Sequence, residues 1–559
     1  MGQTKGSINM IAKTIAALSF TLMALAAPLS AQARDLDKIQ EDFLKLKFGM
    51  FIHFNMSTFV PGGWSTGKED PLAFNPENLD MGKWADAAKS AKMKYAILTV
   101  KHTGGWCLWP TKTTDHNVSL FKNYKDGKAD IVQEFVDAFR SRDIKVGFYY
   151  CFPLWGKCWP NHMTLPHKDY ATGKIDARGL IEAQFKELLT NYGDVSVIWV
   201  DQSTTPNGGI KPGDWVKIKQ FVHKLQPNCV VIANNSSDFE RTDIYGFEFP
   251  YSLEMPAPDN TKPTEVCDKL NGGWFSNPRG SAPPVRSAHY IVNRMLIPLN
   301  NRNSNYLLNC SPEHTGNFNP ETITRLKEIG DLWDPENTAK QGDGIYGIID
   351  KPVESINTGK PECFICFNKD LSKESRGKVA EILKKHNSTA TFFVSENSVR
   401  NERKSLTALV KAGNALGNPT TANEPIDKEK GLGVGKHIYP IQNYIKRYEK
   451  PVAALIPGDK YSWNIWTALS YFSLVAIKPG YTATDAQSAT DIAAKAKPGD
   501  IIMVNSTPDA INALNGMLDK LTTRGLKCEN IRSGLLRCTD KKLQLTAKDA
   551  GAKVETGRE

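Results

Sequence analysis

The sequence has no dense run of lysine or arginine, although it carries 70 basic against 60 acidic residues and a formal charge of +10. Proteins that bind nucleic acids usually gather their basic residues into a patch or stripe, so the scattered charge argues against such a partner. Beyond the first 33 residues no stretch reaches about 18 apolar residues, and no membrane span is predicted. There is also no repeat with a period of about 20 to 50 residues and no low-complexity block.

Length and composition are those of a globular protein with two or three domains: 559 residues, 40% of them apolar and 23% charged. Residues 1–33 have the pattern of a secretory signal peptide, because Lys5 and Lys13 precede an apolar run from Ile15 to Pro28 and small residues follow it. We therefore expect an exported protein, periplasmic or secreted. A retained N-terminal anchor is the alternative.

The ten cysteines permit disulfides in an exported protein, but the sequence does not assign partners. Cys363 and Cys366 form a Cys-x-x-Cys motif, which occurs in redox and zinc sites. No second motif of this kind and no nearby histidine pair completes a metal site. Because Cys363–Phe367 is apolar throughout, we interpret it as a buried strand with structural cysteines.

Short apolar runs alternate with longer amphipathic ones between about Leu46 and Gly330. Strands are predicted at Phe48–Phe54, Tyr95–Val100, Lys145–Cys151, Val195–Asp201 and Cys229–Ala233. Helices are predicted at Met81–Lys92, Ile131–Arg140, Ile181–Tyr192 and Trp215–Leu225. Strands that are apolar throughout and separated by helices indicate a parallel sheet covered on both sides. Seven or eight such units in about 290 residues favour a (β/α)8-type barrel over an open doubly wound sheet.

A second α/β domain follows, with a boundary near Asp343–Gly359, where Gly359-Lys360-Pro361 interrupts the pattern. Its predicted helices are Lys378–His386, Ser405–Ala412 and Ala510–Thr522, and its predicted strands are Thr389–Val394, Val452–Ile456 and Ile501–Val504. The expected organisation is a signal peptide at 1–33, a catalytic barrel at 34–345 and the second domain at 346–559.

Polar side chains stand at the carboxyl ends of the predicted strands, where (β/α)8 barrels carry their active sites. These are His53, then Lys101 and His102, then Tyr149 and Tyr150, and finally Asp201. Any one of them could be a cap or loop residue, but four strands delivering such groups to one rim favour a site. The connecting loops add Trp64, Trp106, Trp109 and Trp274. Aromatic rings beside carboxylates and histidines suit a sugar, because rings stack on its C–H faces and polar groups bind its hydroxyls.

The first domain resembles the family 29 glycoside hydrolases, the retaining α-L-fucosidases, from Lys47 to Asn309. Trp199-Val200-Asp201 stands where that family has its nucleophile strand. The other matching blocks are Lys47–Phe54, Glu69-Asp70-Pro71 with Phe74-Asn75-Pro76, Leu108–His116, Pro263-Thr264-Glu265 leading to Gly273-Trp274-Phe275, and Leu307-Leu308-Asn309. Several of these blocks look like the branch that prefers α-1,3/1,4-linked fucose.

The resemblance implies a double displacement with Asp201 as nucleophile and Glu265 as acid/base, and Glu254 and Glu69 as alternatives for the acid/base. A retaining glycosidase needs its two carboxyl groups about 5–5.5 Å apart. The residues implied to hold and wall the fucose are His53, Trp64, His102, Tyr150 and Trp274. No metal or cofactor is required, and the expected partner is a fucosylated oligosaccharide or glycoconjugate. The oligomeric state is left open.

The chain departs from that family at two places. The family usually has Lys-His-His-Asp-Gly-Phe where this chain has Lys101-His102-Thr103-Gly104-Gly105-Trp106, and Gln202 replaces the glycine after the nucleophile. The missing second histidine normally contacts an axial hydroxyl of the sugar. A preference for a related sugar and a glycan-binding pseudoenzyme are therefore the alternatives to a fucosidase.

The second domain resembles the polysaccharide deacetylases with the NodB-type deformed barrel, in Lys378–Asn387, Ala390–Val394, Ala412–Asn418 and Lys497–Ile502. That family holds zinc with an aspartate pair and a His-x-x-x-His motif. Here Asn368 and Lys369 replace the aspartates, Pro419 and Asn423 replace the histidines, and Asn505 replaces a late histidine. The expectation is an inactive module, with glycan binding or domain packing as the roles left to it.

Overall fold

The computed structural model describes residues 34–152, 177–201, 210–276, 285–337, 348–368, 371–450 and 452–549. The expected signal peptide, Gln202, Lys369 and part of the predicted domain boundary lie outside these residues. Within the described ranges, no helix combines the length and the apolar character needed to cross a bilayer.

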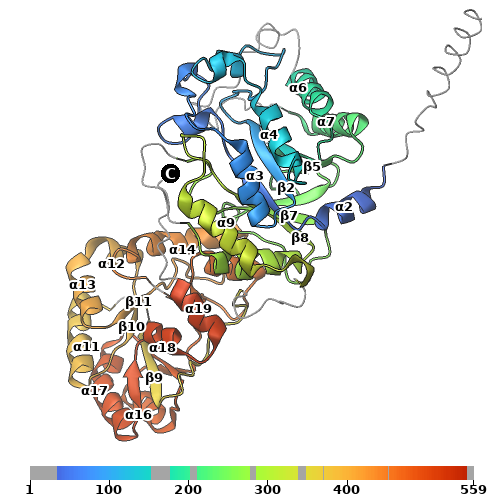
Figure 1. Ribbon diagram of the computed structural model, residues 1–559. Helices are drawn as coiled ribbons and strands as arrows, with labels where there is room; N and C mark the ends of the chain where they lie inside the picture. Colours follow the sequence, from blue (N-terminus) through green and yellow to red (C-terminus); the bar gives the residue numbers. More distant parts are fainter. Residues whose placement is uncertain are drawn as a thin grey trace, which may run out of the picture.

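Eight parallel strands close into a barrel in chain order, so the (β/α)8-type barrel predicted for the first domain is confirmed. Figure 1 shows the barrel in blue to green beside a second domain in yellow to red. Its strands are β1 (Phe48–Ile52), β2 (Tyr95–Lys101), β3 (Lys145–Cys151), β4 (Val197–Asp201), β5 (Val230–Ala233), β6 (Ile244–Glu248), β7 (Thr264–Lys269) and β8 (Ser304–Asn309).

Helices cover most of the outer face of the barrel. They begin at side-chain caps, for example Asp80 and Asp130, whose carboxylates accept the backbone N–H of Lys83 and Gln133. The α-helices are α2 (Leu36–Leu44), α3 (Met81–Ser90), α4 (Ile131–Arg140), α6 (Ala177–Asn191), α7 (Pro212–Leu225), α8 (Ile297–Asn300) and α9 (Pro320–Leu332). A π-helix at Tyr290–Leu296 leads into α8. The fully described connections β5–β6 and β6–β7 contain no helix.

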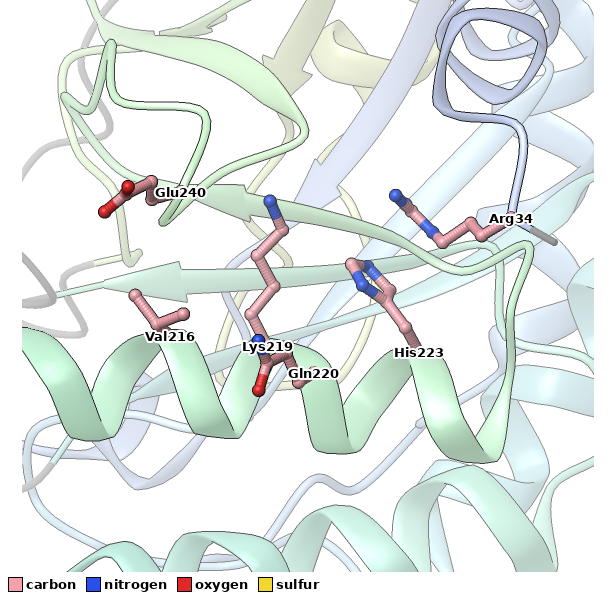
Figure 2. Close-up of a pocket in the computed structure, with 6 residues that line it drawn as sticks. All are labelled: Arg34, Val216, Lys219, Gln220, His223 and Glu240. Carbon is pink, nitrogen blue, oxygen red and sulfur yellow. The ribbon is translucent and has the colours of Figure 1, made fainter.

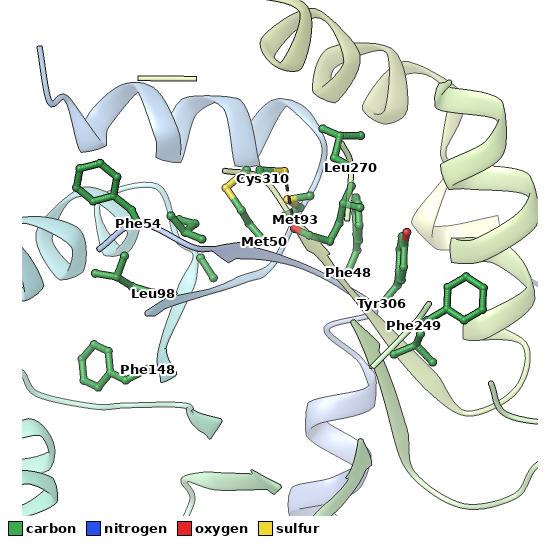
Figure 3. Close-up of a cluster of buried hydrophobic side chains, with 14 of the residues drawn as sticks. Phe48, Met50, Phe54, Met93, Leu98, Phe148, Phe249, Leu270, Tyr306 and Cys310 are labelled. Carbon is green, nitrogen blue, oxygen red and sulfur yellow. Dashed lines mark hydrogen bonds between the residues drawn. The ribbon is translucent and has the colours of Figure 1, made fainter. Parts of the chain in front are cut away.

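Two apolar layers hold the barrel together. Side chains that point inward, among them Phe51, Tyr95, Tyr149 and Trp199, fill its interior. Side chains that point outward pack against the surrounding helices, and Figure 3 shows several of them, including Met50, Leu98, Phe148, Phe249 and Tyr306. The alternation is interrupted once, where the register of β2 against β3 shifts between Thr99 and Lys101.

The second domain is α/β, as predicted. A parallel sheet with the order β11-β10-β9-β15-β14, with β16 also paired to β9, is joined by the Asn418–Ala454 bridge to the β12–β13 pair. Its strands are β9 (Glu362–Phe367), β10 (Thr391–Phe393), β11 (Ala415–Gly417), β12 (Ala453–Ala454), β13 (Val475–Ala476), β14 (Tyr481–Ala483), β15 (Ile501–Val504) and β16 (Lys527–Glu529). Its helices are α11 (Lys373–Lys385), α12 (Glu396–Asn401), α13 (Arg403–Lys411), α14 (Gly431–Ile445), α15 (Trp463–Tyr471), α16 (Ala486–Lys495), α17 (Pro508–Thr523), α18 (Ile531–Arg537) and α19 (Lys541–Asp549).

The Cys-x-x-Cys motif lies on the buried strand β9, as predicted. The Cys363 thiol faces Cys528 on the neighbouring strand β16, with 3.4 Å between the two sulfur atoms, and Cys366 packs near Met503. Among the described residues every cysteine is a buried free thiol. The motif therefore belongs to the packing of the sheet.

Candidate active site

Ionisable and polar side chains gather at the carboxyl ends of the barrel strands. Asp201 ends β4, Asn234 follows β5, Glu248 ends β6 and Lys269 ends β7. Because the strands are parallel and the barrel is closed, these ends meet at one rim. His53 and His102 directly follow β1 and β2 and join the same group.

Asp201 and Glu248 share one hydrogen-bond donor. The amide nitrogen of Asn234 donates to Asp201 Oδ1 at 3.0 Å and to Glu248 Oε2 at 2.7 Å. The two carboxylate oxygens can therefore lie no further apart than the sum of these distances, about 5.7 Å, which is near the spacing that a retaining glycosidase uses. Asn235 holds the backbone of Glu248, because its side-chain oxygen accepts the Glu248 N–H at 2.9 Å.

Glu248 is set up to hold a proton near neutral pH. Burial and, second, the negative charge of Asp201 raise the pKa of Glu248 to about 7, although the Asn234 hydrogen bond and the Lys269 charge oppose the rise. A carboxyl group with this pKa can donate a proton and take one back at neutral pH. Two neighbouring carboxyl groups, one of them pushed toward the neutral form, are the arrangement expected of an acid/base and nucleophile pair.

Tyr149 forms one wall beside Asp201. Its hydroxyl donates to Asp201 Oδ2 at 2.8 Å, so both oxygens of that carboxylate are held. The Tyr149 ring stacks on His102, with 5.4 Å between the centroids and an angle of 14°, and also on Trp199, at 5.4 Å and 20°. The nucleophile candidate is thus fixed in direction by groups that are themselves packed in place.

His53 is neutral and oriented by Asn309. Its Nδ1 lies 2.8 Å from Asn309 Oδ1, and burial lowers the pKa of the imidazole to about 3. The Asn309 amide nitrogen donates to the Trp274 carbonyl at 2.9 Å, and the Trp274 ring lies 4.9 Å from the His53 ring. A single buried asparagine therefore positions both a histidine and an aromatic ring at the rim.

The remaining wall is aromatic and partly open. His102 lies 5.3 Å from the Trp64 ring and 4.8 Å from the Phe275 ring, and its Nδ1 lies 3.1 Å from the Thr103 hydroxyl. Trp64 is 41% exposed, so part of this residue is accessible to a ligand. The structure thus brings together five of the residues predicted for the site: His53, Trp64, His102, Asp201 and Trp274.

Glu265 lies inside the barrel and away from this rim. It is the second residue of β7, four residues before Lys269, which places it roughly 13 Å deeper along the strand. Its two oxygens accept the Tyr95 hydroxyl at 2.6 Å and the Trp199 indole N–H at 2.9 Å. Burial raises the pKa of Glu265 to about 7 against these two hydrogen bonds. Its side chain fills the interior below Trp199.

Tyr150 points to the outside of the barrel, between β3 and α6. Its hydroxyl donates to Gln184 Oε1 and accepts from Lys101 Nζ at 3.1 Å, and all three side chains are buried. The side chains of β3 alternate, so Tyr149 takes the inward place predicted for Tyr150. The register shift in β2 turns Lys101 outward and leaves His102 at the rim.

The two alternative acids also lie elsewhere. Burial raises the pKa of Glu69, but hydrogen bonds from Trp106, Thr66 and Ser65 outweigh it and lower the pKa to about 2. This carboxylate ties its own loop together and is ionised at neutral pH. Glu254 accepts the Gly431 N–H of α14 at 3.3 Å and belongs to the contact between the domains.

Three rim residues were not predicted from the sequence, namely Asn234, Glu248 and Lys269, and at the end of β3 it is Tyr149 rather than Tyr150 that lines the rim. The Lys269 charge acts on both Glu248 and His53, and its nitrogen lies 5.4 Å from the Trp274 ring centre. The signal that identifies Asp201, a polar residue ending a strand, applies to Glu248 and Lys269 as well. This signal was missed because β6 and β7 themselves were not predicted: they contain polar residues and do not have the continuous apolar pattern used to find strands.

At the place predicted for zinc ligands in the second domain, the residues that the structure describes form no fitting set. The Asn368 amide nitrogen donates to Asn505 Oδ1 at 2.9 Å, and its oxygen accepts the Ser506 N–H at 2.8 Å. Neutral amides that satisfy one another are poor substitutes for carboxylates and imidazoles. Among the residues that the structure describes, no group of three or more His, Cys, Asp and Glu side chains is arranged to hold a metal.

A cavity of about 400 Å³ lies beside α7, away from the rim residues (Figure 2). Beneath it, Asp243 is fully buried and meets Arg34 at 2.7 Å, Lys219 at 3.0 Å and His223 at 2.9 Å. Burial raises the pKa of Asp243, but the hydrogen bond and charge of His223 and the charges of Lys219 and Arg34 outweigh it and lower the pKa to about 2. This cluster ties α7 and the start of α2 to the β5–β6 connection.

We expect Asp243→Asn to lower the free energy of unfolding at pH 7 by about 3–5 kcal/mol, because buried cations lose their counter-charge. In the native chain this carboxylate stabilises the fold above the unfolded pKa near 3.8 and loses that effect as the pH falls toward 2. Urea unfolding between pH 2 and 7 measures both effects. Glu240→Gln, an exposed residue lining the same cavity, is the control and should stay within about 0.5 kcal/mol of the native chain.

Comparisons with known proteins give family matches along most of the chain. Residues 63–337 match the family model described as Alpha-L-fucosidase, and residues 355–475 match the one described as Polysaccharide deacetylase. The chain is 29% identical over 309 residues to Alpha-L-fucosidase 1 of Arabidopsis thaliana, covering 51% of this chain and 57% of that protein. It therefore spans little more than half the length of this relative.

Two further proteins illustrate the similarity. Tissue alpha-L-fucosidase of Mus musculus is 28% identical over 339 residues, covering 54% of this chain and 70% of the mouse protein. The solved structure of Alpha-L-fucosidase isoenzyme 1 from Paenibacillus thiaminolyticus aligns with a TM-score of 0.44 and 25% identity, covering 57% of this chain and 80% of that one.

Proposed function

We propose that this protein, whose residues 63–337 form a domain of the α-L-fucosidase family, hydrolyses terminal α-L-fucosides of glycans with retention of the anomeric configuration. The observation that carries the proposal is the carboxyl pair Asp201 and Glu248 bridged by Asn234 at the barrel rim. The expected signal peptide would place this activity outside the cytoplasm. A preference for α-1,3/1,4-linked fucose is part of the proposal.

In the first step Asp201 attacks the anomeric carbon of the fucoside. Tyr149 and Asn234 hold its two oxygens, so the carboxylate is aimed before the substrate arrives. Glu248 gives its proton to the glycosidic oxygen as the C–O bond breaks. The alcohol leaves, and a β-linked fucosyl ester of Asp201 remains.

In the second step Glu248, now a carboxylate, takes a proton from water as the water oxygen attacks the anomeric carbon. Asp201 leaves with the electron pair of the ester bond, and α-L-fucose is released. His53, whose lowered pKa keeps it neutral, and His102 bind the sugar hydroxyls, while Trp64, Trp274 and Phe275 contact its apolar face and methyl group.

Glu248 takes the role that the sequence assigned to Glu265. Both carboxyl groups have a pKa raised to about 7, so the pKa does not separate them. Position does: Glu248 shares Asn234 with Asp201, whereas Glu265 is 1% exposed and both its oxygens accept hydrogen bonds from buried rings. A general acid must reach the atom that it protonates.

The second domain is proposed to have no deacetylase activity, because the amide network around Asn368 and Asn505 supplies neither zinc ligands nor a base.

The test is a panel of aryl glycosides and fucosylated oligosaccharides given to the full chain, with the first-formed product followed by NMR. Release of α-L-fucose from aryl fucosides and from α-1,3/1,4-linked oligosaccharides is expected. Initial formation of the β-anomer would overturn retention. Binding of fucosylated glycans without turnover would overturn the proposed enzymatic activity and favour a glycan-binding protein. The replacement of the family's His-Asp by Thr103-Gly104 would then provide a reason for the missing activity.

A further inference from the structure

The barrel lacks helices of its own around β6, and the second domain covers that gap. Residues 249–263 connect β6 to β7 without a helix. Apolar side chains of this connection, Phe249, Leu253 and Met255, share one continuous core with Ile465, Trp466 and Leu469 of α15 and Val434 and Ile438 of α14. Helices of the second domain thus occupy the place that a barrel helix has elsewhere, and Figure 1 shows α14 at the edge nearest the barrel.

Helix α15 binds the β6–β7 connection through specific contacts. The Thr467 hydroxyl donates to the Leu253 carbonyl at 2.7 Å, and the Trp463 indole N–H donates to the Met255 carbonyl at 2.9 Å. The Tyr471 ring meets the Phe249 ring edge-on at 5.7 Å. Thr467 is fully buried, so its hydroxyl and the Leu253 carbonyl satisfy each other where water does not reach.

Helix α14 approaches the same connection through two glycines one turn apart. A β-carbon at Gly431 would lie 2.3 Å from the Ser252 carbonyl oxygen, and one at Gly435 would lie 2.4 Å from Leu253 Cδ1. Backbone blocks any side chain at Gly431, so only hydrogen fits there, whereas a β-carbon at Gly435 would force the Leu253 side chain to move. The close approach also lets the Gly431 N–H reach Glu254 at 3.3 Å.

The segment held in this way is the turn that follows Glu248. The Glu248 carbonyl oxygen accepts the backbone N–H of Ser252 at 2.9 Å and its hydroxyl at 3.0 Å. The next residue, Leu253, is the one that Thr467 and Gly435 contact. A short chain of contacts therefore runs from α14 and α15 through Leu253 and Ser252 to the backbone of Glu248.

We propose that the second domain serves the barrel as a positioning element: α14 and α15 hold the turn Glu248–Met255 so that the Glu248 carboxyl group reaches the glycosidic oxygen. Thr467 and Gly435 are positioning residues, because they act through Leu253 and touch no substrate. The inference rests on the proposed function of Glu248. It gives a module whose described residues offer no fitting zinc ligands a structural reason to remain fused to the barrel.

The test uses the full chain with Thr467→Val and Gly435→Ala, each of which changes one contact to Leu253. The two substrates are phenyl α-L-fucoside, whose leaving group needs a proton, and 2,4-dinitrophenyl α-L-fucoside, whose leaving group does not. We expect kcat/KM to fall roughly 10- to 100-fold for the phenyl fucoside and to change less than about 3-fold for the activated one. Gly377→Ala in α11, where an added β-carbon meets nothing within 4 Å, is the matched control and should change neither value.

Hydrogen exchange of residues 249–255 supplies a readout that needs no turnover. Faster exchange of this segment in both variants, with the barrel strands unchanged, is expected. Equal losses with both substrates, or unchanged exchange in 249–255, would overturn the inference. If the native chain hydrolysed neither fucoside, the proposed function would fail, and the exchange measurement would still decide whether the second domain holds the turn.

Discussion

Replacing Asp201 by alanine is expected to lower kcat for an aryl α-L-fucoside on the order of 10⁶-fold, the size of effect seen when a covalent nucleophile is removed. The physical reason is that, among the rim residues that the structure describes, the other carboxyl group is Glu248, which protonates the leaving group in the proposed mechanism and so cannot replace Asp201 in the fucosyl ester. Steady-state kinetics at pH 6, where Glu248 is largely protonated, measures the loss. Circular dichroism of the variant checks that the barrel is intact.

Azide gives this prediction a stereochemical control. In Asp201→Gly the small anion can enter the space left by the carboxylate and attack the α-fucoside directly. One inversion then produces β-L-fucosyl azide, which NMR identifies. Full activity of Asp201→Ala, or an azide product of α configuration from Asp201→Gly, would exclude Asp201 as the nucleophile.

Much of the fold could be predicted because it depends on local patterns. The strands of the first half are apolar along their whole length, and the helices between them have amphipathic spacing, so element type and parallel topology follow from the residues. The observed ranges of β2, β3 and α4 differ from the predicted ones by at most one residue. The strands β6 and β7 escaped prediction because Tyr245, Gly246, Glu265 and Asp268 interrupt the apolar pattern.

The site was harder to predict. Whether a strand side chain points into or out of the barrel, and how deep it lies along the barrel axis, are not local properties of the sequence. Both faces of β3 are apolar, so the sequence does not tell which of Tyr149 and Tyr150 points inward. The depth of Glu265 depends on where β7 begins, and a difference of a few residues moves a side chain from the rim to the interior. The role of the second domain is less local still, because Leu253 and Thr467 are joined only by the packing of two domains.

Glu248 is expected to set the alkaline limb of the pH profile. Its pKa is raised to about 7 by burial and by the Asp201 charge, and the acid must be protonated in the free enzyme for the first step. The value of kcat/KM should therefore be highest below pH 7 and fall about tenfold for each pH unit above it. In Glu248→Gln we expect kcat/KM for phenyl α-L-fucoside to fall about 10²- to 10⁴-fold and the alkaline limb to disappear, because an amide holds no proton to lose.

A series of three variants separates Glu248 from the other carboxylates. Glu254→Gln should retain the alkaline limb, because its side chain faces α14. Glu265→Gln should lower the stability of the fold, because it alters the hydrogen bonds from Tyr95 and Trp199. The molecules that remain folded should still show the alkaline limb of the kcat/KM profile. Azide added to Glu248→Ala should yield α-L-fucosyl azide, since the anion attacks a β-fucosyl ester that Asp201 has already formed.

One outcome would return the acid/base role to Glu265: loss of the alkaline limb in Glu265→Gln together with an unaltered pH profile in Glu248→Gln. The proton would then have to travel from the barrel interior past Trp199.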